Sequence, residues 1–113
     1  MALKRMLLEI GMGNDLHGGD YTKAAIRAVQ DAVHHSSMNM VRSLGIDHSE
    51  VNVEVNIGVQ QPDKVDVAAV AATLPVGKVT VNVVKGGLDI PDPEANDIAC
   101  VATAGIVVRL DIP

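Results

Sequence analysis

The sequence predicts a two-layer sandwich of the α+β or α/β class, with the element order β-α-β-α-β-β. Three segments alternate apolar with polar residues, two show helical apolar spacing, and an acidic stretch with prolines precedes the last apolar segment. Two strand–helix–strand crossovers predict a mostly parallel four-stranded sheet. Polar residues at every second strand position predict that both helices cover one face, and the long final connection predicts an antiparallel last strand.

The first part of the chain is predicted to contain one strand and one long helix. Alternating apolar residues indicate a strand over residues 3–11. Asp20 is the expected N-cap, because its carboxylate can accept a hydrogen bond from an N–H group of the first helical turn. Apolar residues at helical spacing then predict a helix that starts at Tyr21, passes residues 34–35 and continues toward residue 44, where Gly45 would end it.

The middle of the chain is predicted to form a strand, a helix and a second strand. Residues 51–60 alternate valine or isoleucine with more polar residues and give the clearest strand pattern in the sequence. Pro62 is expected to open a helix that Pro75 and Gly77 would end. The next strand is expected over residues 78–85.

The last part of the chain is predicted to contain a loop and a final strand. A pair of glycines at residues 86–87 would end the preceding strand. The acidic, proline-containing residues 89–97 are expected to form a loop. Residues 98–112 are expected to form a β-rich segment, interrupted or bent at Gly105.

The composition predicts one domain, residues 1–113, that associates with copies of itself. The chain is 48% hydrophobic and 20% charged, which is typical of globular proteins. Tyr21 is its one aromatic residue, so aliphatic side chains and methionine must form the core. Such side chains bury less area than aromatic ones, and a small domain buries a modest share of its surface. We therefore expect a homo-oligomer.

Charge and cysteine content argue against several partners. Nine basic and fourteen acidic residues give a formal charge of −5, without a basic cluster or an aromatic stacking surface, so no nucleic-acid partner is expected. The single cysteine, Cys100, fits a reducing compartment. Residues 1–10 are too charged for a signal peptide, and the apolar stretch 67–76 is too short for a membrane span. The expected protein is cytoplasmic and has no membrane partner.

A glycine-rich run at residues 11–20 is the strongest candidate for a ligand site. It holds Asp15, His17 and four glycines, namely Gly11, Gly13, Gly18 and Gly19. Glycine at this density indicates unusual backbone dihedrals or close backbone approach. Free N–H groups at the start of the following helix would favour a carboxylate or phosphate. The spacing fits neither the dinucleotide-binding fingerprint nor the P-loop.

Further residues are expected at the same edge of the sheet. The carboxyl ends of parallel strands share one edge, where open sheets bind ligands. That edge would bring Gln60 and Gln61 close to the run, together with Lys85, Gly86 and Gly87. We expect an anionic or amide ligand held by loop N–H groups and Lys85. The sequence names no cofactor.

Asp15 and His17 allow three interpretations. As an acid–base pair, the carboxylate would orient the imidazole, which would transfer protons or bind substrate. As structural residues, Asp15 would bond N–H groups of its own turn and His17 would pack. As metal ligands, they would need further donors, of which His35 is a weak candidate. We weigh the first interpretation most heavily.

The remaining histidines and the cysteine are expected to have structural roles. His34 and His35 are adjacent, so on a helix they diverge by about 100°. His48 lies in a polar connection. Cys100 is expected to pack in the last strand as a small apolar residue.

The segment Gly11-Met12-Gly13-Asn14-Asp15-Leu16-His17-Gly18 resembles the signature Gly-x-Gly-x-Asp-x-His-Gly of a small family of uncharacterised proteins. That family occurs in bacteria and, behind a long N-terminal extension, in plants. The likeness continues in residues 22–25, 31–36 and 74–77 and in the glycine pair 86–87. The resemblance implies that Asp15 and His17 are the positions to test, and it gives His35 more weight. It implies no activity, and a similar two-layer design in ring-opening amidases is an analogy of fold alone.

Two functions compete at this point. In the first, the protein is a small-molecule enzyme or binding protein in which His17 transfers a proton and Asp15 orients it. In the second, it is a structural or regulatory homo-oligomer without catalysis, built on the polar strand face of Asn52, Glu54, Asn56, Thr80 and Asn82. The sequence leaves open whether the chain is an enzyme.

Overall fold

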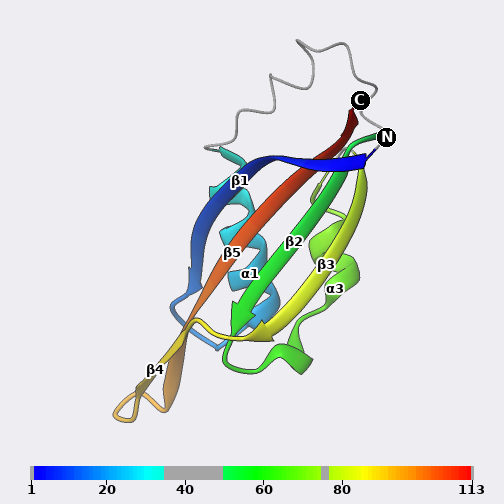
Figure 1. Cartoon of the computed structure of the whole chain (residues 1–113). Coiled ribbons are helices and arrows are strands. Elements are labelled where there is room, and N and C mark those ends of the chain that lie inside the picture. The colour runs from blue at the N-terminus through cyan, green and yellow to red at the C-terminus, as the bar shows by residue number, and fades with distance from the viewer. Residues whose placement is uncertain (1, 35–49, 75–76, 113) are drawn as a thin grey trace.

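The computed structural model describes residues 2–34, 50–74 and 77–112. The elements in chain order are β1 (Ala2–Asp15), α1 (Tyr21–His34), β2 (Asn52–Val59), the 3-10 helix η2 (Pro62–Lys64), α3 (Val67–Ala71), β3 (Lys78–Lys85), β4 (Leu88–Asp92) and β5 (Asp97–Ile112). Figure 1 looks onto the open face of the sheet, with α1 and α3 behind it on the other face. No helix in the described part of the chain is long and apolar enough to span a membrane.

The sheet is mixed and has five strands, so the predicted mostly parallel four-stranded sheet is wrong. Its strand order is β1-β5-β2-β3, and β4 pairs with the first part of β5. Among the described strands, β2 and β3 form the one parallel pair, while β5 runs antiparallel to β1, β2 and β4. The last strand is therefore central rather than an addition to one edge.

The difference between the predicted and the observed sheet has a topological cause. A strand–helix–strand crossover sets the direction of the second strand, but it leaves room for another strand between the two. β1 and β2 do run in the same direction, because both are antiparallel to β5, which lies between them. The strand that fills this space comes last in the sequence, where no local pattern indicates its neighbours.

β1 is longer than predicted, and the glycine-rich run begins inside it. The strand extends to Asp15, with a register shift between Arg5 and Leu7. Asp20 caps α1 as predicted, since its Oδ1 accepts a hydrogen bond from the Lys23 N–H at 3.1 Å. The predicted continuation of the helix toward residue 44 lies outside the described residues, as does its predicted end at residue 45.

The second helix is split into two short pieces. Pro62 opens η2, which lasts for 3 residues. α3 starts separately at Val67, and Oδ1 of its N-cap Asp66 accepts a hydrogen bond from the Ala69 N–H at 3.1 Å. Thr22 of α1 holds the junction, because its hydroxyl accepts a hydrogen bond from the Asp66 N–H at 2.9 Å.

The C-terminal part contains a hairpin where a loop was predicted. Residues 89–97 form most of β4, a turn and the first residue of β5. β5 continues through Gly105, where it pairs with Ile10 of β1 and Asn56 of β2. β4 takes over as the neighbour of β5 where β2 ends, since β2 pairs with β5 as far as Thr103 and β4 from Val101.

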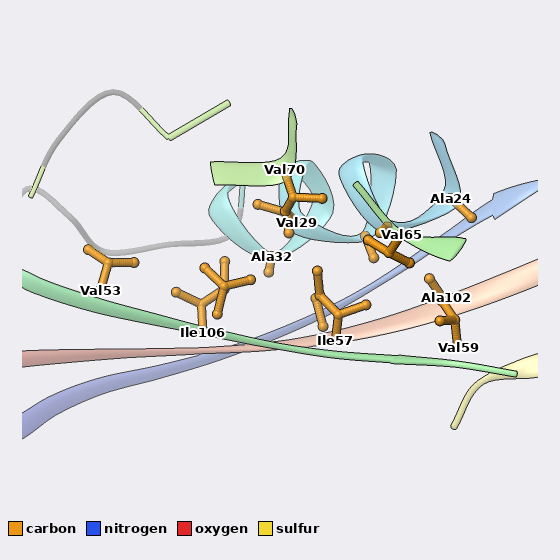
Figure 2. Packing of buried hydrophobic residues seen from close by; sticks show 14 of the residues in the cluster. Ala24, Val29, Ala32, Val53, Ile57, Val59, Val65, Val70, Ala102 and Ile106 are labelled. Atoms are coloured by element: carbon orange, nitrogen blue, oxygen red, sulfur yellow. The ribbon is translucent and has the colours of Figure 1, made fainter. Parts of the chain in front are cut away.

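The core lies between the sheet and the helices and consists almost entirely of small aliphatic side chains. Figure 2 shows side chains of α1 and α3 meeting those of the strands, among them Val29, Val70 and Ile57. These three side chains are fully buried. Tyr21, at the start of α1, is the one aromatic member of the core.

α1 packs close to β1 because two residues of the strand have no side chain. A Cβ atom at Gly11 would lie 2.5 Å from the Ala28 carbonyl oxygen, and one at Gly13 would lie 2.5 Å from the Ala24 carbonyl oxygen. These are backbone atoms, which cannot yield unless α1 moves. Alanines on α1, including the fully buried Ala32, complete this close contact.

Candidate functional site

The candidate site lies at the end of the sheet where β1, β2 and β3 finish. These three strands run in one direction, so the segments that follow them lie at the same end of the molecule (Figure 1). The hairpin of β4 and β5 projects past this end. The segments that the sequence analysis singled out therefore share an edge, although the sheet is not parallel throughout.

Asp15 is buried and organises the turn after β1. Its side chain is 7% exposed, and Oδ2 accepts a hydrogen bond from the Asp20 N–H at 2.9 Å. Its Oδ1 lies 4.0 Å from Lys23 Nζ and 3.9 Å from Arg27 Nη1, both on α1. A buried carboxylate needs such partners. Asp15 thus ties the turn to α1, and a different residue contacts His17.

Asp97, the first residue of β5, is the carboxylate that contacts His17. His17 Nδ1 lies 3.0 Å from Asp97 Oδ2. The other oxygen, Oδ1, accepts hydrogen bonds from the N–H groups of Gly18 and Ile98, both at 2.8 Å. The side chain of His17 is 88% exposed, so its second ring nitrogen is open to a ligand. Asp97 therefore makes the contact with His17 that the sequence analysis expected of Asp15.

The protonation of this pair follows from the partners of Asp97. Hydrogen bonds from the N–H groups of Gly18 and Ile98, and then from His17, hold the pKa of Asp97 below its usual value. The carboxylate is therefore ionised at neutral pH and can only accept hydrogen bonds. His17 Nδ1 must then carry a proton, which leaves Nε2 as the free acceptor of the neutral imidazole.

An open hollow of about 500 Å³ lies beside Asp97, and His17 is not among its lining residues. It is lined by one residue of the turn after β1 and six of the hairpin: Gly18, Pro91, Asp92, Pro93, Asn96, Asp97 and Ile98. The hairpin turn is held by a hydrogen bond from the Ala95 N–H to Asp92 Oδ1 and another from the Asn96 N–H to the Pro93 carbonyl. Because the lining carries carboxylates and no basic side chain, the hollow suits neutral groups better than anions.

Three of the N–H groups around the turn and the start of α1 have partners within the chain. The Gly18 N–H donates to Asp97. The Asp20 N–H donates to Asp15, and the Lys23 N–H donates to Asp20. Two carboxylates of the chain, Asp15 and Asp20, thus lie at the positive end of α1.

Comparisons with known proteins place this chain in a family. A family described as "Conserved hypothetical protein (Lin0512_fam)" matches residues 5–108. The chain belongs to this Lin0512 family. It is also similar to the crystal structure of an FtsZ-like protein of unknown function from Nostoc punctiforme PCC 73102, at 36% identity over 99% of both chains, with a TM-score of 0.86. No curated protein matches the chain.

The glycines of the run have different surroundings in this Lin0512 member. Gly11 and Gly13 lie in β1 against α1, away from the hollow. Gly18 and Gly19 have φ angles of +92° and +60°, which favour glycine, and a Cβ atom at Gly19 would lie 2.5 Å from Ile98 Cγ2. Gly18 alone of the four lines the hollow. Ligand binding by these glycines stays a prediction.

Lys85, Gly86 and Gly87 lie at the same end of the sheet, but across it from His17. Lys85 ends β3, which is three strand positions from β1, a distance of about 14 Å at the usual strand spacing. Gln60 Nε2 donates hydrogen bonds to the carbonyls of Gly86 and Gly87 at 3.0 and 3.3 Å. This turn carries the chain from β3 to β4, and a ligand contact by Lys85 stays a prediction.

Tyr21 joins three elements beside the site, and no motif indicated it. Its hydroxyl donates a hydrogen bond to Asp89 Oδ2 at 2.5 Å and accepts one from Gln61 Nε2 at 2.9 Å. Burial, followed by the hydrogen bond to Asp89, raises the pKa of Tyr21 to about 12. Asp89 pairs with Cys100 across β4 and β5, so Tyr21 anchors the base of the hairpin to α1.

Other histidines and the cysteine do not extend the site. His34 has no described side chain, and His35 and His48 lie outside the described residues. Within residues 2–34, 50–74 and 77–112, no group of three or more His, Cys, Asp or Glu side chains could hold a metal ion. Cys100 is buried, and burial raises the pKa of its thiol, so it packs as an apolar residue.

Proposed function

We propose that this protein binds a small neutral molecule with an amide or carbonyl group in the hollow, and that His17 exchanges a proton with it. The His17–Asp97 pair carries the proposal. It presents an exposed imidazole whose Nδ1 is held 3.0 Å from an ionised carboxylate, next to an open hollow. A carboxylate that orients an imidazole in this way is a recurrent arrangement in general acid–base catalysis.

The charge of the surroundings selects a neutral ligand. Asp92 and Asp97 line the hollow, and the N–H groups of Gly18 and Asp20 are bonded to carboxylates of the chain. Nε2 of neutral His17 can accept a hydrogen bond from an amide N–H, and the protonated ring can donate one to a carbonyl oxygen. Pro91, Pro93 and Ile98 add apolar surface for the rest of the ligand. An anionic ligand is therefore not part of the proposal.

Titration with cyclic amides and ureas, followed by NMR, tests the proposal. We expect these compounds to shift the ring signals of His17 and the backbone signals of Gly18 and Ile98, whereas carboxylates of the same size do not. His17→Gln and Asp97→Asn should abolish the response. Lys85→Gln is the matched control and should keep it, because Lys85 lies about 14 Å from β1.

Three results would contradict the proposal. One is that no amide or urea of the series shifts these signals. Another is that the carboxylates shift them instead, which would favour an anion site. The third is a response that His17→Gln leaves unchanged, which would place binding elsewhere on the protein.

A further inference from the structure

Exposed apolar side chains lie on the open face of the sheet over β1 and β4. On β1, Leu8, Ile10 and Met12 are 48%, 68% and 62% exposed. They alternate with residues that face α1, so they point away from the helices. On β4, Leu88 and Ile90 are 55% and 51% exposed. We call these five residues the apolar face.

β5 connects the two parts of the apolar face. Leu8 pairs with Val107 toward one end of β5, and Leu88 pairs with Val101 toward the other. Thr103 and Gly105 lie between them, and no other atom comes within 4 Å of where the Cβ of Gly105 would be. Scattered apolar side chains are normal on a protein surface, but several exposed ones on one face of a sheet favour an interaction surface.

The free edge of β1 is closed at Met12 and Asn14. The Met12 N–H donates a hydrogen bond to Asp31 Oδ2 at 2.9 Å, and the Asn14 carbonyl accepts one from Arg27 Nη1 at 2.7 Å. A strand whose backbone groups are taken in this way cannot pair with a further strand there. A partner strand therefore cannot pair with this end of β1.

We infer that a second copy of this chain covers the apolar face, with the two sheets packed face to face about a twofold axis. The lengths of the strands give the open face an area on the order of 800 Å², which is what each partner contributes to a standard stable interface. The apolar face contains no charged residue. At its border, Arg109 Nη1 and Glu54 Oε1 pair with each other at 3.4 Å, so the surface does not match a highly charged partner.

A twofold axis makes this pairing self-complementary. An axis that passes through the apolar face places the same apolar side chains of both copies against each other. The polar residues of β2 and β3, which the sequence analysis considered as a subunit contact, then lie beside the centre of the interface. This inference does not depend on the proposed ligand, because the apolar face and the hollow are formed by different side chains.

Sedimentation velocity tests the inference on the whole chain. We expect wild-type protein to sediment with about twice the mass of the 11.8 kDa chain and to dissociate on dilution. Ile10→Glu places a charge on the most exposed member of the apolar face and should abolish the dimer while the circular dichroism spectrum is kept. Val67→Glu is the matched control, because Val67 is 42% exposed on α3, on the other side of the sheet, and this variant should stay dimeric.

The inference is overturned by any of three outcomes. Wild-type protein could keep the mass of one chain at every concentration, or it could form an assembly of more than two copies. The dimer could also persist in Ile10→Glu. The first two outcomes are read from wild-type protein, so they do not depend on the folding of a variant.

Discussion

The two halves of the glycine-rich run have opposite surroundings. Residues 11–15 belong to β1, and Gly11, Gly13 and Asp15 are buried toward α1. Residues 16–20 form an exposed turn, in which His17 reaches Asp97 on a strand far along the chain. One short motif therefore combines a packing half with an exposed half that carries His17, and glycine density alone does not distinguish them.

Gly13→Ala should have the largest effect, because it affects the packing half directly. The new Cβ would lie 2.5 Å from the Ala24 carbonyl oxygen, so α1 would have to move. We expect a loss of about 3 kcal/mol or more in the free energy of unfolding, measured by urea denaturation. Gly18→Ala is the comparison in the other half. Its Cβ would meet nothing closer than 3.9 Å, and the φ of +92° alone should cost about 1–2 kcal/mol. Equal losses of stability in Gly13→Ala and Gly18→Ala would contradict the division of the run into a packed half and an exposed half.

Asp15→Asn and His17→Gln extend the same comparison to polar side chains. Asp15 is buried and accepts the Asp20 N–H, so its replacement should cost about 1–3 kcal/mol of stability. His17 is exposed, and its replacement should cost less than about 0.5 kcal/mol. Urea denaturation of the two variants checks this order. A larger loss in His17→Gln than in Asp15→Asn would show that the turn depends on the imidazole.

Tyr21 follows the run directly as the first residue of α1, and alkaline titration tests its buried position. Its folded-state pKa is about 12 against an ordinary value of 10.0, so the unfolded chain loses the phenolic proton first. The stability that Tyr21 contributes is therefore full below pH 10 and is lost as the pH rises toward 12. The chain has one tyrosine and no tryptophan, so near-ultraviolet absorbance reports this group alone. Titration near pH 10 in the folded protein would contradict the buried hydrogen bond to Asp89.

Asp97→Asn should have an effect on stability that depends on pH. The pKa of Asp97 is lowered in the folded protein, so its contribution is present above the ordinary carboxyl pKa of about 3.9 and is lost as the pH falls through the lower folded value. Thermal unfolding between pH 2 and pH 6, both rough limits, compares the variant with wild-type protein. We expect the stability of Asp97→Asn to fall less steeply than that of wild-type protein as the pH is lowered. Identical profiles would mean that the turn does not depend on this carboxylate.

Local patterns predicted the strands and their directions better than their order. The alternation of valines in β2 and β3 and the capping residue Asp20 are local features, and the structure has them where they were expected. β4 was missed because Pro91 and its acidic neighbours are typical of loops. The central position of β5 depends on pairing with strands at the other end of the chain, which no nearby residue encodes.

The candidate site was also predicted only in its local part. His17 stood out because a histidine in a glycine-rich turn has few structural uses. Its partner Asp97 lies 80 residues away, and the register that pairs Asp15 with Cys100 brings the two together. The sequence analysis paired His17 with Asp15 because they are close in sequence. In β1 the side chain of Asp15 instead turns inward with those of the buried positions.

The tautomer of His17 tests the central claim most directly. Long-range proton–nitrogen NMR of the ring distinguishes the two nitrogens, and the signals of His17 are those missing from His17→Gln. If Asp97 orients the ring, neutral His17 is protonated at Nδ1 with Nε2 free, and Asp97→Asn loses this preference. Neutral His17 protonated mainly at Nε2, or a tautomer that Asp97→Asn leaves unchanged, would contradict the account.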